Sequence, residues 1–487
     1  MAKPAPIKPA ALLKLPAFGC RRLKDNFLLT NDWGFHDFLS PEEFSSFTKG
    51  AIPVDSRLWL RLRQKGFIRD HLEFEDLARS WKEKHSFLWE APSLHILVLT
   101  LRCNQACSYC QSASVKTDPR RYDMTWRTAR AAIDMAFCSP SPDLSIEFQG
   151  GEPLLNWPVL KRAVEYGLAK NRGAGKNLRF ALVSNFSLLD REKADFLVAR
   201  RASLCTSLDG PGPIHDLNRA CPSNGSHGLS VGWIKELTRL YKQRRKPGEP
   251  ACRPSALATI TARTLPHAQD VVDEYARLGL RSIFLRPLSP FGRARRVWRE
   301  IGYEPAQFLS FYSQALDRIL EHNRRGKRLS EKTAEILLSK ILGQDNGRYM
   351  DMRSPCGAAI GQLAYNHDGD VYTCDEGRML ACAGDKIFRL GNVFSDSYRN
   401  LVCATGAKAC AWSSNLECHP LCLRCAYRPY CGTCPVYNYQ TQGSIWGVMP
   451  SNGRCAIYKG VFDILFERIQ RPGDLEIFKN WLADRRW

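Results

Sequence analysis

The segment from His95 to Cys110 reads His-Ile-Leu-Val-Leu-Thr-Leu-Arg-Cys-Asn-Gln-Ala-Cys-Ser-Tyr-Cys, and it decides the fold. Its first half is an apolar and β-branched run, which is typical of a strand covered on both faces. Cys103, Cys107 and Cys110 follow with the spacing Cx3Cx2C. Three thiolates this close together can surround one soft metal centre. A [4Fe–4S] cluster on three cysteines keeps one iron free for another ligand, whereas a structural zinc site would need a fourth ligand nearby.

Outward from this segment, the chain repeats the strand pattern and alternates it with helical stretches. Further apolar runs occur at residues 144–148, 178–184, 202–208, 255–261 and 282–285. Helical patterns lie between them at residues 126–137, 158–170, 191–200, 229–244 and 266–278. Such alternation predicts parallel βα units, and about six units are too few for a closed eight-stranded barrel. We therefore predict an α/β fold whose open, partial (β/α)6 barrel spans residues 94–300.

The segments that flank this barrel differ from it in composition. Residues 1–21 are rich in Pro, Ala and Lys and are predicted to be a disordered tail. Two short strands around an Asn31–Gly34 turn, and helices beginning after Ser40 and Ser56, predict a small module at residues 22–70. The rest is expected to be a charged connector at 71–93, a helical linker at 301–350, a loop-rich segment at 351–460 and a helix or tail at 461–487.

Charge and cysteine content stand out in this chain of 487 residues. Lys and Arg number 70 against 49 Asp and Glu, so the formal charge is +21, and 19 residues are cysteines. No apolar run is long enough for a spanning helix, and Lys14 and Pro16 interrupt the weak lipoprotein-like box at Leu15–Cys20. We therefore expect a cytoplasmic protein whose reduced cysteines bind metal or clusters. The basic excess suits either an anionic partner or a solvated surface.

The three-cysteine motif, with Tyr109 before its last cysteine, resembles the signature of the radical S-adenosylmethionine (SAM) superfamily. Gln149-Gly-Gly-Glu-Pro153 resembles the glycine-rich turn of that superfamily and follows the second predicted strand. Ser184-Asn185, Ser207-Leu-Asp-Gly210 and Arg286–Gly292 extend the resemblance through residue 300, although Asp209-Gly210 also fits a simple turn. The resemblance implies that SAM binds to Tyr109, Gly150, Gly151, Glu152, Asn185 and Ser207. Glu152 would bind the methionine amino group.

The reaction implied by this resemblance starts with an electron from the reduced cluster, which splits SAM into methionine and a 5′-deoxyadenosyl radical. That radical abstracts a hydrogen atom from a peptide side chain, while the barrel orients SAM and excludes water. An external electron donor is implied as well. Thioether formation, carbon–carbon crosslinking, epimerisation and oxidation all use these parts, so the sequence does not select the product.

A second group of cysteines resembles the SPASM extension of radical SAM enzymes that modify peptides and proteins. This resemblance implies two auxiliary [4Fe–4S] clusters, which makes three with the SAM-binding cluster. The distal cluster would use Cys422, Cys425, Cys431 and Cys455, and the proximal cluster would use Cys356, Cys374 and Cys434. Two residues separate Cys431 from Cys434, where the family has three.

The proximal cluster has no obvious fourth ligand in the sequence. Either Cys382 or Cys418 completes it, or the site is open for substrate. The alternative to both clusters is a zinc ribbon on the two Cx2C pairs. The cysteines outside the two implied ligand sets are small apolar residues by default, and only Cys382 and Cys418 among them are ligand candidates. These nine are Cys20, Cys138, Cys205, Cys221, Cys252, Cys382, Cys403, Cys410 and Cys418.

Asp375 directly follows Cys374. In sulfatase-maturing relatives an aspartate at the matching position accepts a proton at the substrate site, so the resemblance implies a catalytic role for Asp375. A charged surface turn with Glu376 and Arg378 is the alternative interpretation.

Leu28–Gly34, Phe38–Phe44 and Cys374–Met379 resemble the HxsB-type maturases of the His-Xaa-Ser system. This implies a precursor with His-Xaa-Ser motifs, a small companion protein and a second radical SAM protein as partners. Residues 22–70 would then resemble winged-helix modules that bind a leader peptide as an added strand, or else they simply cap the barrel. A radical SAM RNA modifier and a non-enzymatic zinc-ribbon protein are the alternatives. The sequence lacks an aromatic and basic RNA-binding appendage, so neither nucleic acid nor membrane is expected as a partner.

Overall fold

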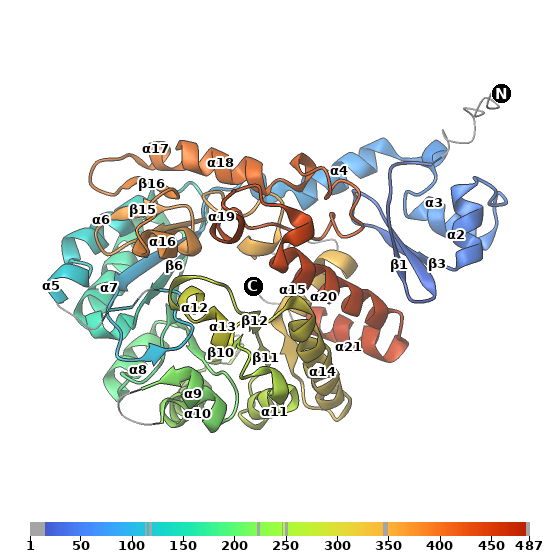
Figure 1. The fold of residues 1–487 in the computed structure, drawn as a ribbon. Helices are drawn as coiled ribbons and strands as arrows, with labels where there is room; N and C mark the ends of the chain where they lie inside the picture. The colour runs from blue at the N-terminus through green and yellow to red at the C-terminus, as the bar shows by residue number, and fades with distance from the viewer. Residues whose placement is uncertain are drawn as a thin grey trace.

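The main sheet of the protein has nine strands, in the order β12-β10-β8-β7-β6-β4-β14-β15-β16 (Figure 1). The computed structural model describes residues 15–112, 114–115, 119–221, 225–245, 247–248, 252–343 and 349–483. The first six strands of that order pair in parallel. Five of them lie where the sequence predicts them, whereas β12 begins at the last residue of the run predicted at 282–285. They are β4 (Leu94–Thr100), β6 (Asp143–Gly150), β7 (Asn177–Val183), β8 (Ser203–Ser207), β10 (Ser255–Ile260) and β12 (Leu285–Pro287). The predicted α/β fold with an open, partial barrel is confirmed.

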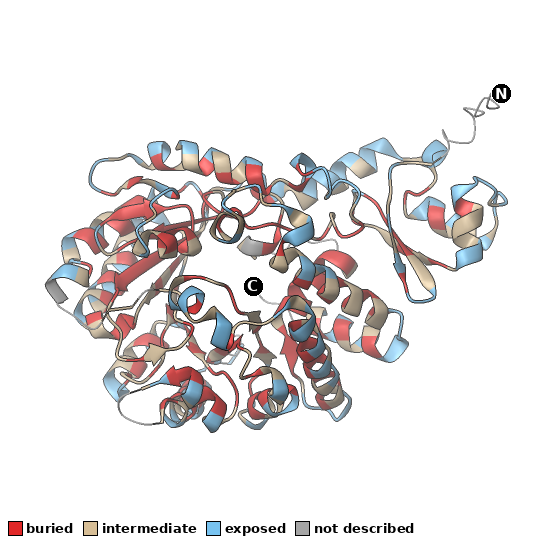
Figure 2. Cartoon of the chain, viewed as in Figure 1, coloured by how far each residue is buried: buried red, intermediate tan, exposed pale blue. Residues whose placement is uncertain are grey.

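Helices follow these strands and cover the outer face of the sheet (Figures 1 and 2). Strand β6 shows the reason: Leu144, Ile146 and Phe148 are buried in a core shared with the helices. Glu147 and Gln149 alternate with them and line the cavity inside the barrel, because successive side chains of a strand point to opposite faces. The covering helices are α6 (Trp126–Phe137), α7 (Trp157–Ala174), α8 (Arg191–Ala199), α10 (Ser226–Arg244) and α11 (Ala268–Arg277).

The cysteine-rich segment extends the barrel sheet instead of forming a separate body. Its first strand, β14 (Gln362–Tyr365), pairs in parallel with β4, and β15 (Asp370–Tyr372) and β16 (Arg389–Asn392) continue the sheet antiparallel. His95 on β4 is buried and its Nδ1 lies 2.9 Å from the Tyr365 hydroxyl. Sequence analysis predicts a loop-rich segment here and misses these strands, since each is only three or four residues long.

The rest of the cysteine-rich segment consists of short helices, and two pairs of longer helices pack beside the barrel. The short ones are α16 (Asp375–Cys382), α17 (Tyr398–Val402), α18 (Thr405–Ser414) and α19 (Pro435–Gln442). The longer ones are α14 (Pro305–Arg324), α15 (Lys332–Leu342), α20 (Gly453–Ile469) and α21 (Pro472–Ala483), which share one core with β10 and α11. Among the described residues, no helix combines the length and the hydropathy needed to cross a bilayer.

A small module of strands and helices precedes the barrel and lies at the far right of Figure 1. Strands β2 (Asn26–Thr30) and β3 (His36–Leu39) and helices α2 (Pro41–Thr48) and α3 (Arg57–Gln64) lie where the sequence predicts them. Ser40 caps α2 in a capping box with Glu43. A further strand, β1 (Gly19–Leu23), pairs with β2, so the predicted tail ends earlier than residue 21. Residues 1–14 of that tail lie outside the described part. The connector at 71–93 contains α4 (Phe74–Lys84).

This N-terminal module docks on the loop that carries the distal cysteines. The Thr30 hydroxyl donates to the Ala426 carbonyl at 2.7 Å, and the Tyr430 hydroxyl donates to the Gly34 carbonyl at 3.0 Å. Leu28 on β2 belongs to the same buried core as Tyr430 and α20. The module and the distal cysteine loop therefore form one packed unit.

Candidate functional site

The three cysteines of the first motif lie at the carboxyl end of β4, on the rim of a cavity of about 730 Å³ inside the barrel. The loop is held in place on both sides of Cys103: the Arg102 guanidinium pairs with Asp123 at 2.6 Å, and the Cys103 amide donates to the Val115 carbonyl at 3.1 Å. Cys107 and Cys110 line the same cavity as Cys103. The fold thus places three thiols along one cavity at the strand ends, where parallel barrels place catalytic groups.

Gly150 and Gly151 let the end of β6 lie directly against this loop. A Cβ on Gly150 would lie 2.4 Å from the Thr100 carbonyl oxygen, and one on Gly151 would lie 2.3 Å from the Arg102 carbonyl oxygen. No side chain fits at such distances. Both glycines also line the cavity, so the backbone of this turn can lie close to a bound ligand. The amides of Gly151 and Glu152 donate to the carbonyls of Thr100 and Arg102, both at 2.8 Å.

Gly151→Ala is expected to displace the end of β6 or the cysteine loop, because the added Cβ would overlap the Arg102 carbonyl. We expect a destabilisation of about 1–3 kcal/mol, as for other overpacked sites, and fewer irons bound by the reconstituted protein. Denaturant unfolding and iron analysis would measure both effects.

Gly173→Ala is the matched control, because Gly173 lies in α7 with no atom within 4 Å of an added Cβ. There the change should raise stability by up to about 1 kcal/mol, since alanine favours helices over glycine. Equal stability and iron content in the two variants would contradict the close approach seen at Gly151.

Glu152 directly follows the two glycines and is fully buried. Its carboxylate forms no ion pair with a cationic side chain among the described residues. Its carboxylate accepts hydrogen bonds from the Ser184 hydroxyl at 2.8 Å and from the amides of Asn185 at 2.8 Å and Leu154 at 3.0 Å. Burial raises the pKa of Glu152 to about 7, although these hydrogen bonds favour the charged form. The carboxylate is thus oriented and lacks a positive partner, which suits an amino group of a ligand.

Tyr109, Asn185 and Ser207, the other residues implied to bind SAM, line the same cavity. The side-chain amide of Asn185 donates to the Asn104 side chain at 3.0 Å, which ties the end of β7 to the cysteine loop. Ser207 is the last residue of β8. The structure therefore gathers the residues of the implied SAM site around one cavity, with the exception of Glu152, which is fully buried and does not line it.

A buried ionic network lies beside Cys107. Asp209 accepts from the Tyr109 hydroxyl at 2.6 Å, from Arg219 at 3.0 Å and from the Thr259 amide at 3.1 Å. A guanidinium nitrogen of Arg219 lies 3.9 Å from the Cys107 sulfur. Burial raises the pKa of the Cys107 thiol to about 11, and the Arg219 charge opposes that rise. Asp209 is therefore more than a turn residue, because it fixes the cation beside a candidate cluster ligand.

The opposite wall of the cavity comes from α16 in the cysteine-rich segment. Asp375 and Glu376 line it there. The fully buried Arg378 donates to the Asp375 carboxylate at 2.8 Å and to the Ser112 hydroxyl at 3.1 Å, so one guanidinium joins Asp375 to the first cysteine loop. The interpretation of Asp375 as a surface turn is wrong, because the residue is buried.

Glu147 is a cavity residue that sequence analysis missed. It lies on β6 inside the barrel and accepts a hydrogen bond of 2.5 Å from the Gln149 amide. Burial raises the pKa of Glu147, and the charge of Asp375 raises it further. The alternation of polar and apolar residues along β6 could have revealed it, because a polar residue on the inward face of a barrel strand faces the site.

The cysteines implied for the distal cluster line a cavity of about 230 Å³ between the distal cysteine loop and the start of α20. Gly432, Met449 and Tyr458 are among its other lining residues. The neighbouring thiol groups and burial raise the pKa of Cys422 to about 11. All four thiols line this one space: Cys422, Cys425, Cys431 and Cys455.

The cysteines implied for the proximal cluster are buried together at the junction of β15, α16 and α19. Cys356, Cys374 and Cys434 belong to one buried cluster, and burial, with the charge of Glu376 and of the other two thiols, raises the pKa of Cys374. Cys382 packs in a different cluster and its sulfur accepts from Arg378 at 3.5 Å. Cys418 is exposed. Neither candidate named from the sequence lies in the proximal group.

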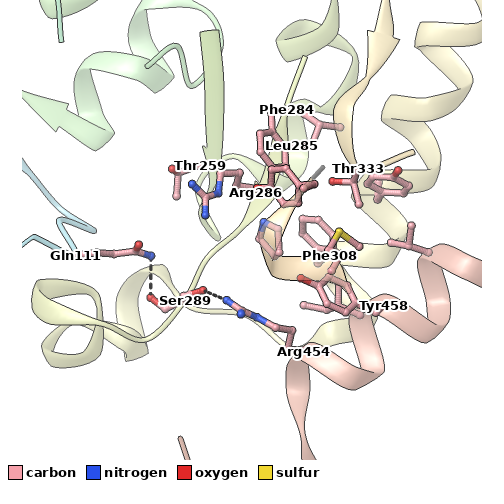
Figure 3. A pocket seen from close by; sticks show the side chains of 16 residues that line it. Gln111, Thr259, Phe284, Leu285, Arg286, Ser289, Phe308, Thr333, Arg454 and Tyr458 are labelled. Atoms are coloured by element: carbon pink, nitrogen blue, oxygen red, sulfur yellow. Dashed lines mark hydrogen bonds between the residues drawn. The ribbon is translucent and has the colours of Figure 1, made fainter. Parts of the chain in front are cut away.

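A smaller cavity of about 80 Å³ lies between the barrel and α20, and Figure 3 shows its lining. The Arg454 guanidinium donates to the Ser289 hydroxyl at 3.1 Å, and the Gln111 amide donates to the Ser289 carbonyl at 3.5 Å (Figure 3). Arg454 also lines the distal cavity and precedes Cys455. The first turn of α20 thereby links the distal site to the last barrel strand and the first cysteine loop.

The three groups of thiols fit iron–sulfur clusters in their donor chemistry, since each consists of thiols alone. Within the described part of the chain, no three His, Cys, Asp or Glu side chains converge as they would on a single metal ion. The thiols of the first motif and of the distal group line cavities, whereas those of the proximal group share one buried cluster.

Comparison with known proteins shows what this site is similar to. Residues 97–226 match the Radical SAM superfamily. The chain is 25% identical over 389 residues to the cysteine-type anaerobic sulfatase-maturating enzyme of Clostridium perfringens (strain 13 / Type A), covering 78% of this chain and 98% of that enzyme. It is 25% identical over 311 residues to the mycofactocin maturase MftC of Mycobacterium ulcerans, covering 63% of this chain and 73% of MftC.

Solved structures agree in fold. The native anSMEcpe structure with bound AdoMet superposes with a TM-score of 0.65 at 20% identity, covering 80% of this chain and 99% of that one. SuiB of Streptococcus suis bound to precursor peptide SuiA gives a TM-score of 0.52 at 13% identity, covering 91% and 99%. Residues 97–226, which carry the cysteine loop and the first parallel strands, thus match the Radical SAM superfamily, and the solved structures share the fold of the chain.

Proposed function

We propose that the chain is a maturase that abstracts a hydrogen atom from a side chain of a ribosomally made peptide or protein. The relatives support this class, because they include a sulfatase-maturating enzyme, a mycofactocin maturase and a protein solved with its precursor peptide. The observation that carries the proposal is the shared cavity. It extends from the three cysteines to Asp375 and Glu376 on α16, which leaves space for a substrate between the SAM site and a carboxylate.

Cys103, Cys107 and Cys110 would hold the SAM-binding [4Fe–4S] cluster, whose chemistry when bound is the reductive cleavage of SAM to a 5′-deoxyadenosyl radical. Gly150 and Gly151 let the backbone of the turn lie close to SAM, and Glu152 orients its amino group. Asn185, Ser207 and Tyr109 shape the rest of that site. The barrel walls exclude water from the reacting atoms.

Asp375 is proposed to accept the proton that the substrate loses. Its ion pair with Arg378 fixes the direction of the carboxylate, and its place on the cavity wall gives it access to substrate. The two auxiliary clusters, on the proximal and distal cysteine groups, would take up the electron left on the product. An external donor supplies the first electron.

The substrate we propose is a precursor with His-Xaa-Ser motifs, acting with a small companion protein and a second radical SAM protein in the cytoplasm. The N-terminal module is proposed to bind the leader along the outer edge of β3. There the Phe38 amide is bonded to the neighbouring Asp37 side chain at 2.9 Å, and the Arg61 side chain reaches the Phe38 carbonyl at 3.4 Å. A leader strand would take over these two backbone groups.

Anaerobic incubation of the reconstituted enzyme with SAM, a reductant and synthetic precursors tests this function. A His-Xaa-Ser precursor should lose two hydrogen atoms by mass spectrometry, and deuterium from its side chain should appear in 5′-deoxyadenosine. A cysteine-containing sulfatase peptide is the control. The full precursor should bind more tightly than its core peptide if the module recognises the leader. Modification of the sulfatase peptide alone would contradict the His-Xaa-Ser assignment, and transfer to neither peptide would contradict the proposed substrate class.

SAM binding is expected to weaken at low pH because the carboxylate of Glu152 must be ionised to bind an amino group. The pKa of Glu152 is raised to about 7 by burial, so protonation removes the acceptor as the pH falls below that value. Between about pH 8 and pH 6 the dissociation constant of SAM should rise, by at most about tenfold per pH unit. Calorimetric titration of the reconstituted enzyme measures it.

Glu152→Gln should bind SAM weakly and without this pH dependence. Glu192→Gln is the control, since Glu192 is exposed in the first turn of α8, and it should behave as the unchanged protein. A pH dependence that survives in Glu152→Gln would assign the titration to another group.

A further inference from the structure

We infer that Cys410 is the fourth thiolate ligand of the auxiliary cluster on Cys356, Cys374 and Cys434. The inference rests on the proposed proximal cluster and completes its ligand set. Sequence analysis counts Cys410 among the small apolar residues, because it lies far from any recognisable cysteine spacing. The fold brings it to the site on α18.

Burial separates four cysteines from all the others. Of the 19 cysteines, only Cys356, Cys374, Cys410 and Cys434 are buried, with exposed fractions of 5%, 3%, 1% and 7%. These same four belong to one cluster, with Phe291, Phe388 and Leu380 among its apolar members. Three of them are the implied proximal ligands, so the fourth is found by its position alone.

The sulfur of Cys410 reaches the proximal group through a shared hydroxyl. The Thr373 hydroxyl lies 3.8 Å from the Cys374 sulfur, and the same side chain hydrogen-bonds the thiol of Cys410. Cys434 and Cys356 share the same buried cluster with Cys410. Cys410 therefore packs together with all three implied ligands, and Thr373 lies beside both its thiol and the Cys374 sulfur.

Hydrogen bonds through the Ser414 hydroxyl hold α18 in this position. The Cys356 amide donates to the Ser414 hydroxyl at 2.9 Å, and that hydroxyl donates to the Cys410 carbonyl at 2.6 Å. Ala407, Cys410, Ser413 and Ser414 form the buried face of α18. One serine thus fixes the helix that carries Cys410 against the turn that carries Cys356.

A complete set of four thiolates changes the role of the proximal cluster. An iron with no protein ligand could bind substrate, as an open position does in catalytic metal sites. With Cys410 bound, all irons are occupied by protein sulfur, and the thiol of Cys410 loses its proton to become a ligand. The proximal cluster then serves electron transfer, and the substrate binds in the barrel cavity.

The test uses the full chain with Cys103, Cys107 and Cys110 replaced by alanine, so that only auxiliary clusters remain. Anaerobic reconstitution should give about eight irons per chain, since each [4Fe–4S] cluster holds about four. Cys410→Ser and Cys410→Val are then added separately. Valine preserves an apolar side chain of similar size, and it would be tolerated if Cys410 only filled space.

Both Cys410 variants should halve the iron content to about four per chain, or retain a cluster with one distinct iron site in Mössbauer spectra. Chelator should remove iron from that cluster at least about tenfold faster, and oxidation should give a three-iron EPR signal. Circular dichroism checks that the fold is kept. Cys382→Ser and Cys418→Ser are the controls and should leave iron content and spectra unchanged.

Unchanged iron content and spectra in both Cys410 variants would overturn the inference while leaving the auxiliary clusters in place. The same would follow if Cys382→Ser or Cys418→Ser produced the spectral change instead. Zinc, or no iron, in the starting variant would remove the proposed auxiliary clusters themselves. The two failures are therefore distinguished before any change at Cys410 is made.

Discussion

Cys103→Ala is expected to abolish SAM cleavage while the barrel remains folded. Cys103 is one of the three thiols of the first motif that line the barrel cavity, and the fourth cysteine in that lining, Cys205, lies within β8 and outside the cysteine loop. The variant should lose about four irons out of about twelve in the reconstituted protein, because one of three [4Fe–4S] clusters is lost. Chromatographic detection of 5′-deoxyadenosine and iron analysis measure the two effects.

Cys138→Ala is the matched control for this change, because Cys138 is exposed at the end of α6 and lies in none of the three cysteine groups. It should keep full iron content and full SAM cleavage. Persistent reductive cleavage in Cys103→Ala would contradict the assignment of the SAM-binding cluster to the first motif. Collapse of the far-ultraviolet circular dichroism would instead reveal a structural role for Cys103.

Asp209→Asn should destabilise the barrel by about 3 kcal/mol, because it removes one partner of a buried ion pair and leaves the other charge uncompensated. Asp209 is fully buried, and the side chain of Arg219 is 9% exposed. Arg219 would also lose its fixed position beside the Cys107 sulfur. Denaturant unfolding of the protein before iron loading measures the stability, and SAM cleavage after loading measures the second effect.

Asp195→Asn provides the comparison, since Asp195 pairs with Arg191 and Arg244 on the surface with 31% of its side chain exposed. Exposed pairs contribute less than about 1 kcal/mol, so this variant should differ little from the unchanged protein. A similar small effect of Asp209→Asn would mean that water or relaxation compensates Arg219. In that case the network would not be needed to hold the cysteine loop.

The barrel could be predicted from the sequence because its strands are long, apolar and separated by helical patterns. The bounds of α6 agree at both ends with the predicted helix at 126–137. Strand β1 could not be predicted, because Gly19–Leu23 contains two arginines and is an edge strand that pairs with β2 alone. Strands β14 to β16 could not be predicted for a related reason, since such short strands are stabilised by the barrel edge that they join.

The first cysteine loop and its glycine turn could be predicted because all of their residues are close in sequence to strand ends. The network of Asp209, Arg219 and Tyr109 could not, because it joins residues that are 10 and 100 positions apart. Cys410 is a similar case, because α18 reaches the proximal cysteines only in the folded protein. Local spacing detects ligands that share a loop, whereas a ligand from a separate helix becomes visible only in three dimensions.

The docking of the N-terminal module on the distal loop sets an order for biosynthesis. Arg21 and Asp463, which form an ion pair, are 442 positions apart, so the module leaves the ribosome long before its docking surface does. Until then Tyr430 and α20 cannot bury the apolar face that contains Leu23 and Leu28. Exposed apolar faces of this kind promote aggregation or chaperone binding. Docking of the module and completion of the distal cysteine loop are therefore late and coupled events, and the N-terminal module of a nascent chain cannot dock before Tyr430 and α20 have been synthesised.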